Sequence, residues 1–173
     1  SLLVKTLMSF ESYQKGDLCI YGLVRDAEKA ETMYADLDCK NLHFIEADIC
    51  DREKLMSFAN LPVDYVIHCA ATTQSLKMIE NPVETLDGLA LGTKNILDLA
   101  RCLNVKSMVA LSSMEAYGVV EDDGRLRKEN ELGSISVAEA RSCYPLEKRM
   151  AEYYCYLYKK EYDVPVKVAR ISQ

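Results

Sequence analysis

The sequence predicts an α/β fold in which a doubly wound parallel sheet is covered by helices on both faces. Short apolar runs alternate along the chain with segments of helical periodicity, which is the order expected of strand–helix repeats. The apolar runs are also nearly continuous, as is typical of parallel strands that are buried on both sides. The length of 173 residues is enough for one domain with a sizeable core, which we take to span residues 1–173.

The first part of the chain is expected to form two helices around a strand. The opening "SLLVKTLMSF" (1–10) is amphipathic and indicates a helix. "DLCIYGLV" (17–24) is a short β-rich run. "DAEKAETMYADL" (26–37) is helical in character, and its first residue, Asp26, is a suitable N-cap because its carboxylate accepts hydrogen bonds from the first turn.

The middle of the chain continues the alternation. "NLHFIEAD" (41–48) indicates a strand and "DREKLMSFA" (51–59) a short helix. "VDYVIHCAA" (63–71) is predicted to be a buried strand. Residues 82–103 are predicted to form a long helix, because their apolar residues recur at helical spacing.

The last part of the chain contains one exception to the alternation. "VKSMVALSS" (105–113) and "VPVKVARI" (164–171) indicate strands, and residues 144–162 indicate a helix with Pro145 in its first turn, where proline is tolerated. The charged residues 118–143 between them match neither period. Ligands of open α/β sheets bind at the carboxyl ends of the strands, so we interpret residues 118–143 as a substrate loop.

Composition excludes several functional classes. The formal net charge of −6 argues against a general affinity for nucleic acid or anionic membranes. No run reaches the roughly 18 apolar residues of a membrane span, and residues 1–10 lack the pattern of a signal peptide. The seven cysteines form no C-x-x-C pair and there are two histidines, so we predict no metal site, and a reducing, cytoplasmic location.

A tyrosine and a lysine at helical spacing form the first candidate site. Tyr144 and Lys148 are four residues apart, so on a helix they share one face. A free tyrosine has a pKa near 10 and is a poor base at neutral pH. A neighbouring ammonium group favours the phenolate, which brings the phenol toward the range of efficient acid–base catalysis.

Several motifs around this pair resemble a known family. They are "VIHCAA", "GTKNILDLA", "VALSSMEAYG", "YPLEKRMAE" and "VKVARIS", and they cover most of the chain. In this order they resemble the extended short-chain dehydrogenase/reductase family, in its NAD-dependent epimerase/dehydratase branch that acts on nucleotide sugars. The motif "RSCY…KRMAE" is most similar to that of UDP-glucuronate decarboxylases and dTDP-glucose dehydratases. The resemblance implies a Rossmann-like fold.

The resemblance assigns roles to three residues. Tyr144 would be the base that deprotonates a sugar hydroxyl while hydride leaves the same carbon. Lys148 would lower the pKa of Tyr144 and bind the nicotinamide ribose. Ser113 would hold the sugar hydroxyl.

The resemblance also implies a bound NAD or NADP. The residues expected to contact this cofactor, besides Tyr144 and Lys148, are Arg25, Asp26, Asp48, Ile49, Ala70 and Ala71. An acidic residue at the end of the 17–24 strand favours NAD, whereas an arginine suits the 2′-phosphate of NADP. Because Arg25 precedes Asp26, the sequence leaves this choice open, and Asp26 as a simple helix cap is equally compatible.

Substrate contacts are expected from Ser75 and Glu115. Glu115 occupies a position where the dehydratases of the family hold an acid that assists elimination, although it also fits a simple loop carboxylate. The preceding position, often Asp in those enzymes, is Met114, which counts against 4,6-dehydration. Leu89 stands where the family usually has Asn three residues before the Gly of "GTKN", which removes a polar contact near the nicotinamide.

The glycine-rich loop that binds the pyrophosphate is not found in this sequence. The seven glycines include none at the required spacing after a first strand. We therefore expect a sheet without its first strand and glycine-rich loop, in a chain truncated at both ends. Because that strand is central to the sheet, the strands on either side of it are expected to have unpaired edges.

The predicted function is epimerisation, dehydration or decarboxylation of a nucleotide sugar through a 4-keto intermediate, with NAD or NADP as cofactor. The alternatives are an NADPH-dependent carbonyl reductase and a non-catalytic dinucleotide-binding sensor. The expected partners are the nucleotide sugar and a second copy of the chain, because this family commonly forms dimers through the helices at 82–103 and 144–162. The sequence does not identify the sugar.

Overall fold

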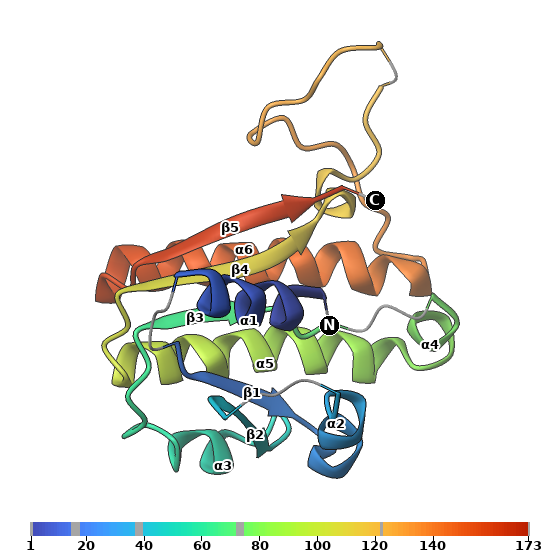
Figure 1. Ribbon diagram of the computed structural model, residues 1–173. Coiled ribbons are helices and arrows are strands. Elements are labelled where there is room, and N and C mark those ends of the chain that lie inside the picture. Colours follow the sequence, from blue (N-terminus) through green and yellow to red (C-terminus); the bar gives the residue numbers. More distant parts are fainter. Residues whose placement is uncertain (1, 15–17, 37–39, 72–74, 122, 173) are drawn as a thin grey trace. The chain divides into compact units, whose positions relative to one another are not determined.

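The computed structural model describes residues 2–14, 18–36, 40–71, 75–121 and 123–172. The chain forms two compact units, Ser1–Asp48 and Ile49–Gln173. In both units, parallel strands are connected by helices (Figure 1). This confirms the predicted α/β class.

The first unit contains one pair of parallel strands. Its elements are α1 (Leu2–Gln14), β1 (Ile20–Val24), α2 (Ala27–Met33) and β2 (Leu42–Glu46). In the β1–β2 pair, Ile20 lies opposite Leu42. Asp26 caps α2 as predicted, because its Oδ1 accepts a hydrogen bond from the backbone N–H of Lys29 at 2.9 Å.

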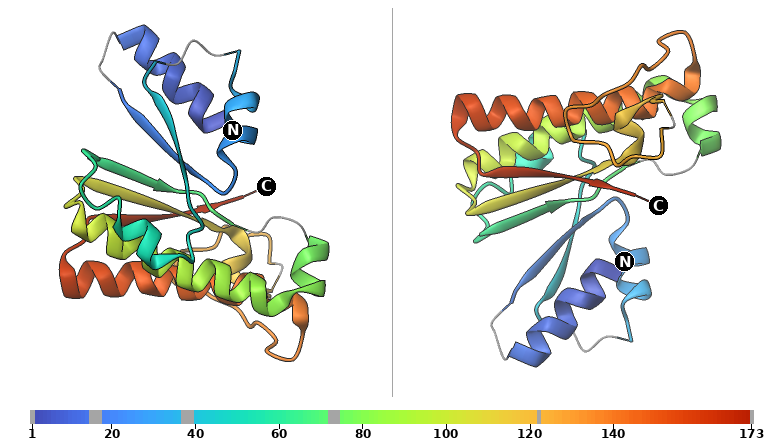
Figure 2. Two further views of the ribbon diagram at one scale, coloured as in Figure 1. Left: turned by 90° about the horizontal axis from the view of Figure 1, so that it is seen from below. Right: turned by 90° about the horizontal axis from the view of Figure 1, so that it is seen from above.

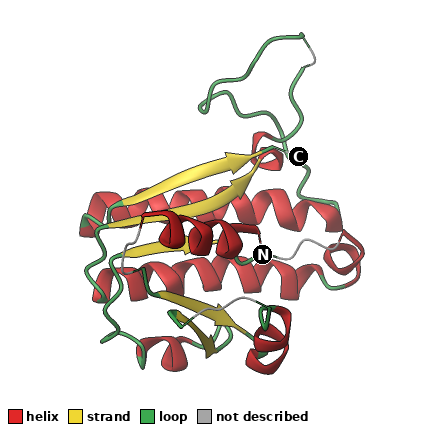
Figure 3. Ribbon diagram, in the orientation of Figure 1, coloured by secondary structure: helices red, strands yellow, loops and turns green. Residues whose placement is uncertain are grey.

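The second unit contains a three-stranded parallel sheet of order β3-β4-β5. Its elements are α3 (Arg52–Met56), β3 (Tyr65–His68), α4 (Ser75–Glu80), α5 (Pro82–Cys102), β4 (Ser107–Ser113), the short 3-10 helices η1 (Met114–Tyr117) and η2 (Ala140–Ser142), α6 (Cys143–Tyr162) and β5 (Val166–Ile171). Figures 2 and 3 show α5 and α6 side by side on one face of this sheet.

The core of this unit lies between the sheet and these two helices. Its most buried apolar residues come from α5, β4, α6 and β5: Leu89, Ile96, Leu97, Ala100, Met108, Ala110, Cys155, Tyr158 and Val166. The long helix α5 begins with Pro82, whose missing N–H would have no partner in a first turn.

The described residues form two separate sheets, and each sheet has two edge strands. β1 and β2 pair only with each other, and β3 and β5 each pair only with β4. This agrees with the predicted sheet that lacks one strand.

The prediction that the whole of the 63–71 strand is buried is wrong. Side chains alternate between the two faces of a strand. His68 is buried on the side of α5 and α6, whereas Tyr65 and Ile67 point the other way and are 66% and 42% exposed.

The remaining differences concern short elements. Helix α4 and the two 3-10 helices were not predicted, because they show no helical period and are not preceded by an aspartate N-cap of the kind that Asp51 provides for the similarly short α3. Asp17 and Leu37, at the ends of predicted elements, lie outside the described residues. No helix in the described part of the chain is long and apolar enough to cross a membrane.

Candidate active site

The second unit brings Ser113, Tyr144 and Lys148 to one end of its sheet. Ser113 is the last residue of β4, and Tyr144 lies in the first turn of α6 with Lys148 one turn further on. In Figure 1 the β4 arrow points toward the end at which α6 begins. Parallel strands collect their carboxyl ends at one edge, where ligands of such folds bind.

Ser113 connects the strand to the residues that follow it. Its Oγ accepts a hydrogen bond from the backbone N–H of Glu115 at 3.2 Å, which caps η1. The Ser113 hydroxyl also lies close enough to the Tyr144 phenol to lower its pKa. The hydroxyl and the phenol are therefore adjacent, as their expected roles require.

The electrostatics of Tyr144 differ from the sequence-based expectation. Burial raises the pKa of the phenol above its usual value of 10.0, and the carboxylate of Glu115 adds to this rise. The nearby Ser113 hydroxyl and the charge of Arg141 act in the opposite direction. The phenol therefore carries its proton at neutral pH.

Lys148 is a buried ammonium group behind the phenol. The residue is only 4% exposed. Its Nζ lies 5.5 Å from the centre of the Tyr144 ring and donates a hydrogen bond to the carbonyl of Leu111 at 3.2 Å. Burial lowers the pKa of Lys148, while Glu147 and Glu152 counteract this. The lysine contacts the face of the ring, so its expected effect on the phenol stays a prediction.

A buried histidine lies near this ammonium group. The Nε2 of His68 and the Oγ1 of Thr93 are 3.0 Å apart. Burial, assisted by the positive charge of Lys148, lowers the pKa of His68 from 6.5 to about 4. His68 is therefore neutral at pH 7 and leaves Lys148 as the positive charge at this position.

Glu115 is held by an arginine that the sequence reasoning did not identify. The Nη2 of Arg141 donates to the Oε1 of Glu115 at 2.9 Å. The guanidinium of Arg141 also lies 5.5 Å from the centre of the Tyr144 ring. Arg141 precedes the Tyr144 helix by two residues, yet no local pattern indicated a contact 26 residues back along the chain.

Glu147 is a second group that the sequence did not single out. The residue is fully buried, and neither carboxyl oxygen has a hydrogen-bond partner within the described residues. Burial raises the pKa of Glu147 from 4.5 to about 8, although Lys148 opposes the rise. The carboxyl is therefore mainly protonated at neutral pH.

This carboxyl predicts how stability depends on pH. Between pH 6.5 and 8, folded Glu147 holds a proton that the unfolded chain has released, so the free energy of unfolding falls as the pH rises. The fall is about 1.5 kcal/mol over this interval, because the slope is about 1.4 kcal/mol per pH unit at first and about half of that at pH 8, where the folded carboxyl is half ionised. Below pH 6.5, His68 has the opposite effect on the free energy of unfolding. Its imidazole is neutral in the folded chain and protonated in the unfolded chain, so its contribution to stability rises with pH.

Urea unfolding followed by circular dichroism at pH 6.5 and pH 8 measures this effect. In Glu147→Gln, the free energy of unfolding should no longer fall between the two pH values. In Glu53→Gln, which changes an exposed residue of α3, it should fall as in the wild type. A wild-type chain that is equally stable at both pH values contradicts the prediction.

Three of the predicted cofactor residues belong to the first unit. Arg25 and Asp26 are exposed after the end of β1, and Asp48 is exposed after β2. Asp26 is engaged as the cap of α2, which supports the capping alternative without deciding between NAD and NADP. The structure does not place these three residues relative to the second unit.

The other predicted contacts lie in the second unit. Ala70 is exposed and Ala71 half-buried after β3, and Ser75 is exposed at the start of α4, beyond residues that are not described. The backbone carbonyl of Ile49 accepts a hydrogen bond from Asn95 at 2.9 Å, and a Cβ at Gly92 would lie 2.3 Å from the Ile49 side chain. Ile49 is therefore packed against α5.

The second unit fits the nicotinamide end of a dinucleotide. The buried Lys148 ammonium has three N–H donors, and one of them has an acceptor among the described residues, so a ribose hydroxyl would complete its hydrogen bonding. The chain contains no glycine-rich loop, so we assign no residues to the pyrophosphate.

Several known enzymes are similar to this chain in sequence or in structure. The chain is 35% identical over 113 residues to UDP-glucuronic acid decarboxylase 1 of Danio rerio, an alignment that covers 64% of this chain and 26% of the relative. An epimerase from Methanothermobacter thermautotrophicus is 27% identical, with a TM-score of 0.71 over 94% of this chain and 46% of that protein.

A third match supports the fold alone. A dTDP-glucose 4,6-dehydratase double mutant from Streptomyces venezuelae, solved with NAD and DAU bound, is 22% identical, with a TM-score of 0.77 over 96% of this chain and 50% of that one. The chain thus spans between about a quarter and a half of the length of these proteins.

The model of the NAD dependent epimerase/dehydratase family matches residues 11–173. The matched range includes the β3, β4 and α6 elements that carry the candidate site. The chain therefore belongs to the NAD-dependent epimerase/dehydratase family, as its motifs indicated.

Proposed function

We propose that the complete gene product is an NAD-dependent enzyme that oxidises a nucleotide sugar at C4 and then decarboxylates, dehydrates or epimerises it. The observation that carries this proposal is the cluster at the end of the β3-β4-β5 sheet. Its phenol lies beside the Ser113 hydroxyl, and a buried lysine lies one turn further along the same helix.

The roles of these residues follow from their chemistry. Ser113 holds the C4 hydroxyl, and Tyr144 removes its proton as general base. Bound NAD supplies the hydride acceptor and a positive charge that favours the phenolate. Lys148 adds a second positive charge and binds the ribose, and the burial of this lysine strengthens these interactions.

Decarboxylation is the outcome that we favour. Oxidation of a hexuronic acid at C4 gives a β-keto acid, which loses carbon dioxide to leave an enolate. A proton taken up at C5 and return of the hydride to C4 then give a pentose, with no net oxidation. Elimination of water needs an acid beside C5 and C6, and this chain has Met114 next to Glu115 where dehydratases often have a pair of acids. The similarity to UDP-glucuronic acid decarboxylases supports the same choice.

Product analysis tests the proposed function. The complete gene product with NAD is incubated with UDP-glucuronate, dTDP-glucose and UDP-glucose, and the nucleotide sugars are analysed by mass spectrometry. Loss of carbon dioxide from UDP-glucuronate is the expected result. Loss of water from dTDP-glucose would replace decarboxylation by dehydration, and no change in any sugar would refute the proposal.

Two further expectations stay proposals. Residues 118–143 begin and end beside the candidate site, which supports their role as a substrate loop. Residue 122 in this segment is not described.

Exposed apolar side chains on α5 and α6, including Leu91, Met150 and Tyr156, support pairing of two copies through these helices. Sedimentation of the complete gene product measures the number of copies.

A further inference from the structure

Arg149, the residue after Lys148, binds three backbone carbonyls. Its Nε donates to the carbonyl of Ala116 at 2.8 Å, and its Nη2 donates to the carbonyls of Tyr117 at 3.1 Å and Gly133 at 2.8 Å. The first two carbonyls belong to η1, and the third lies 16 residues before Arg149 in the 118–143 segment. One side chain of α6 therefore joins η1, which directly precedes this segment, and Gly133 within the segment to the helix that carries Tyr144.

Two glycines near these carbonyls leave space for the guanidinium of Arg149. Gly118 has a φ of 68°, and a Cβ there would lie 2.8 Å from Nη2 of Arg149 and 2.5 Å from the carbonyl of Ser134. A Cβ at Gly133 would lie 1.9 Å from the carbonyl of Val119. Two glycines thus allow the strands of the bridge between Val119 and Ser134 to approach each other beside the arginine.

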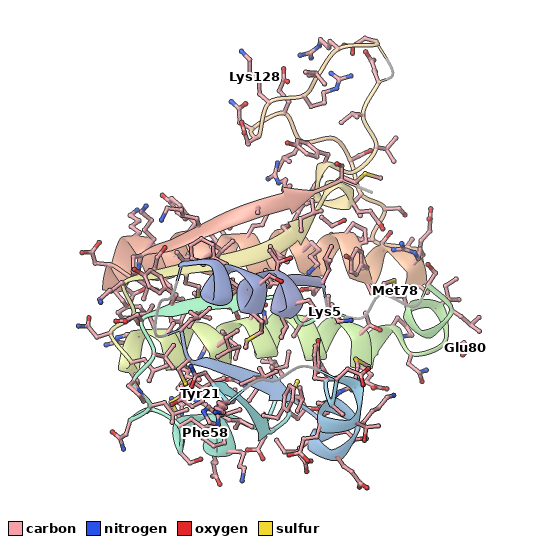
Figure 4. All side chains as sticks on the ribbon, viewed as in Figure 1. Lys5, Tyr21, Phe58, Met78, Glu80 and Lys128 are labelled. Atoms are coloured by element: carbon pink, nitrogen blue, oxygen red, sulfur yellow. The ribbon has the colours of Figure 1, made fainter. Side chains whose placement is uncertain are left out.

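The same turn carries the groups that face the phenol. Ser113 caps η1, and Glu115 lies within it, so both move with the carbonyls that Arg149 holds. Arginine suits this position because its planar guanidinium presents several N–H donors in a fixed arrangement, whereas the donors of lysine all lie on a single nitrogen atom. Figure 4 shows that the far part of the segment, marked by Lys128, projects away from the sheet. Arg170 of β5 donates a hydrogen bond to the carbonyl of Glu129 in this part at 2.8 Å, whereas Arg149 holds the part of the segment next to η1.

We propose that Arg149 is a positioning residue that fixes Ser113, Glu115 and the base of the 118–143 segment relative to Tyr144. This inference rests on the proposed function, because it concerns the geometry of the same site. Arg149 itself bonds only to the protein backbone in the described contacts, so it acts through the residues that it holds.

The test compares Arg149→Met and Arg149→Lys with the wild type in the complete gene product. A displacement of about 1 Å at the reacting groups costs about 100-fold in rate, so we expect Arg149→Met to lower kcat by about 100-fold and Arg149→Lys by about 10-fold. The affinity for NADH, measured by nicotinamide fluorescence, should stay within about twofold, because the lysine and the phenol remain. Arg52→Met, which removes an exposed arginine paired with Asp98, is the matched control and should keep the wild-type kcat.

Hydrogen exchange provides a readout that needs no turnover. Backbone amides of residues 116–134 should exchange faster in Arg149→Met, while those of β3 and β5 keep their rates. Unchanged exchange in this segment overturns the proposal, as does a wild-type kcat in a variant whose segment exchanges faster. If Arg149→Met does not fold, Arg149→Lys decides, and wild-type exchange and kcat in that variant overturn the proposal.

This design separates the two levels of inference. If the wild-type protein converts no nucleotide sugar, the proposed function fails, and the exchange comparison still shows whether Arg149 holds the segment. If the wild type is active and Arg149→Met is equally active, the proposed function stands and the positioning role fails.

Discussion

Tyr144→Phe is expected to lower the turnover of the complete gene product by about 100- to 10,000-fold, the range that general acid–base catalysis contributes. The variant keeps the ring but loses the hydroxyl that lies beside Ser113. Affinity for NADH should stay within about twofold, because Lys148 and the strand ends are unchanged. Turnover is measured with UDP-glucuronate, and cofactor affinity is measured by nicotinamide fluorescence.

The control for this variant is Tyr153→Phe on the same helix. Tyr153 is 56% exposed and stacks on Tyr156 with the ring centres 6.2 Å apart, on the side of α6 that faces away from the core. It should retain wild-type turnover. A non-catalytic sensor would show no difference between the two variants, and full activity of Tyr144→Phe would remove the phenol from the mechanism.

Lys148→Met is expected to lower both turnover and cofactor affinity. Methionine nearly fills the volume of the buried side chain but removes the ammonium group, its hydrogen bond to Leu111 and the donors available to a ribose. Turnover should fall by about 100-fold or more, since the phenolate loses a stabilising charge. Affinity for NADH should fall by about 10-fold, the loss of roughly one hydrogen bond to a charged group.

A spectroscopic readout tests the electrostatic part of this account. The positive charge of Lys148 helps to lower the pKa of His68 to about 4. In Lys148→Met the pKa of His68 should therefore rise, which NMR titration of the imidazole measures. Lys159→Met, at an exposed position of the same helix, should leave turnover and the His68 pKa unchanged. A His68 pKa that does not respond to Lys148→Met would show that burial alone lowers it.

The fold class could be predicted because the sequence contains clear apolar runs and a clear helical period. Apolar runs such as that of β4 and the long periodic stretch of α5 give strong signals, and the helix cap at Asp26 follows from the chemistry of a short acidic side chain. The exposure of Tyr65 and Ile67 was not predictable, because an apolar run does not show which face of a strand is covered.

The candidate site was predictable where its residues lie in recognisable motifs. Tyr144 and Lys148 share a helix face by spacing alone, and Ser113 was placed by the resemblance. The partners of Glu115 and the burial of Glu147 depend on tertiary packing, which brings together residues without any shared local pattern. The three carbonyls bound by Arg149 carry no side-chain signal at all, since every residue has a backbone carbonyl.

A single-turnover experiment tests the central claim most directly. The complete gene product, loaded with NAD, is mixed with UDP-glucuronate that carries deuterium at C4, and the absorbance of reduced nicotinamide is followed. The account predicts a transient signal whose rise is slowed by the deuterium and which is absent in Tyr144→Phe. Conversion of the sugar without any nicotinamide signal, or an equal signal in Tyr144→Phe, would contradict the account.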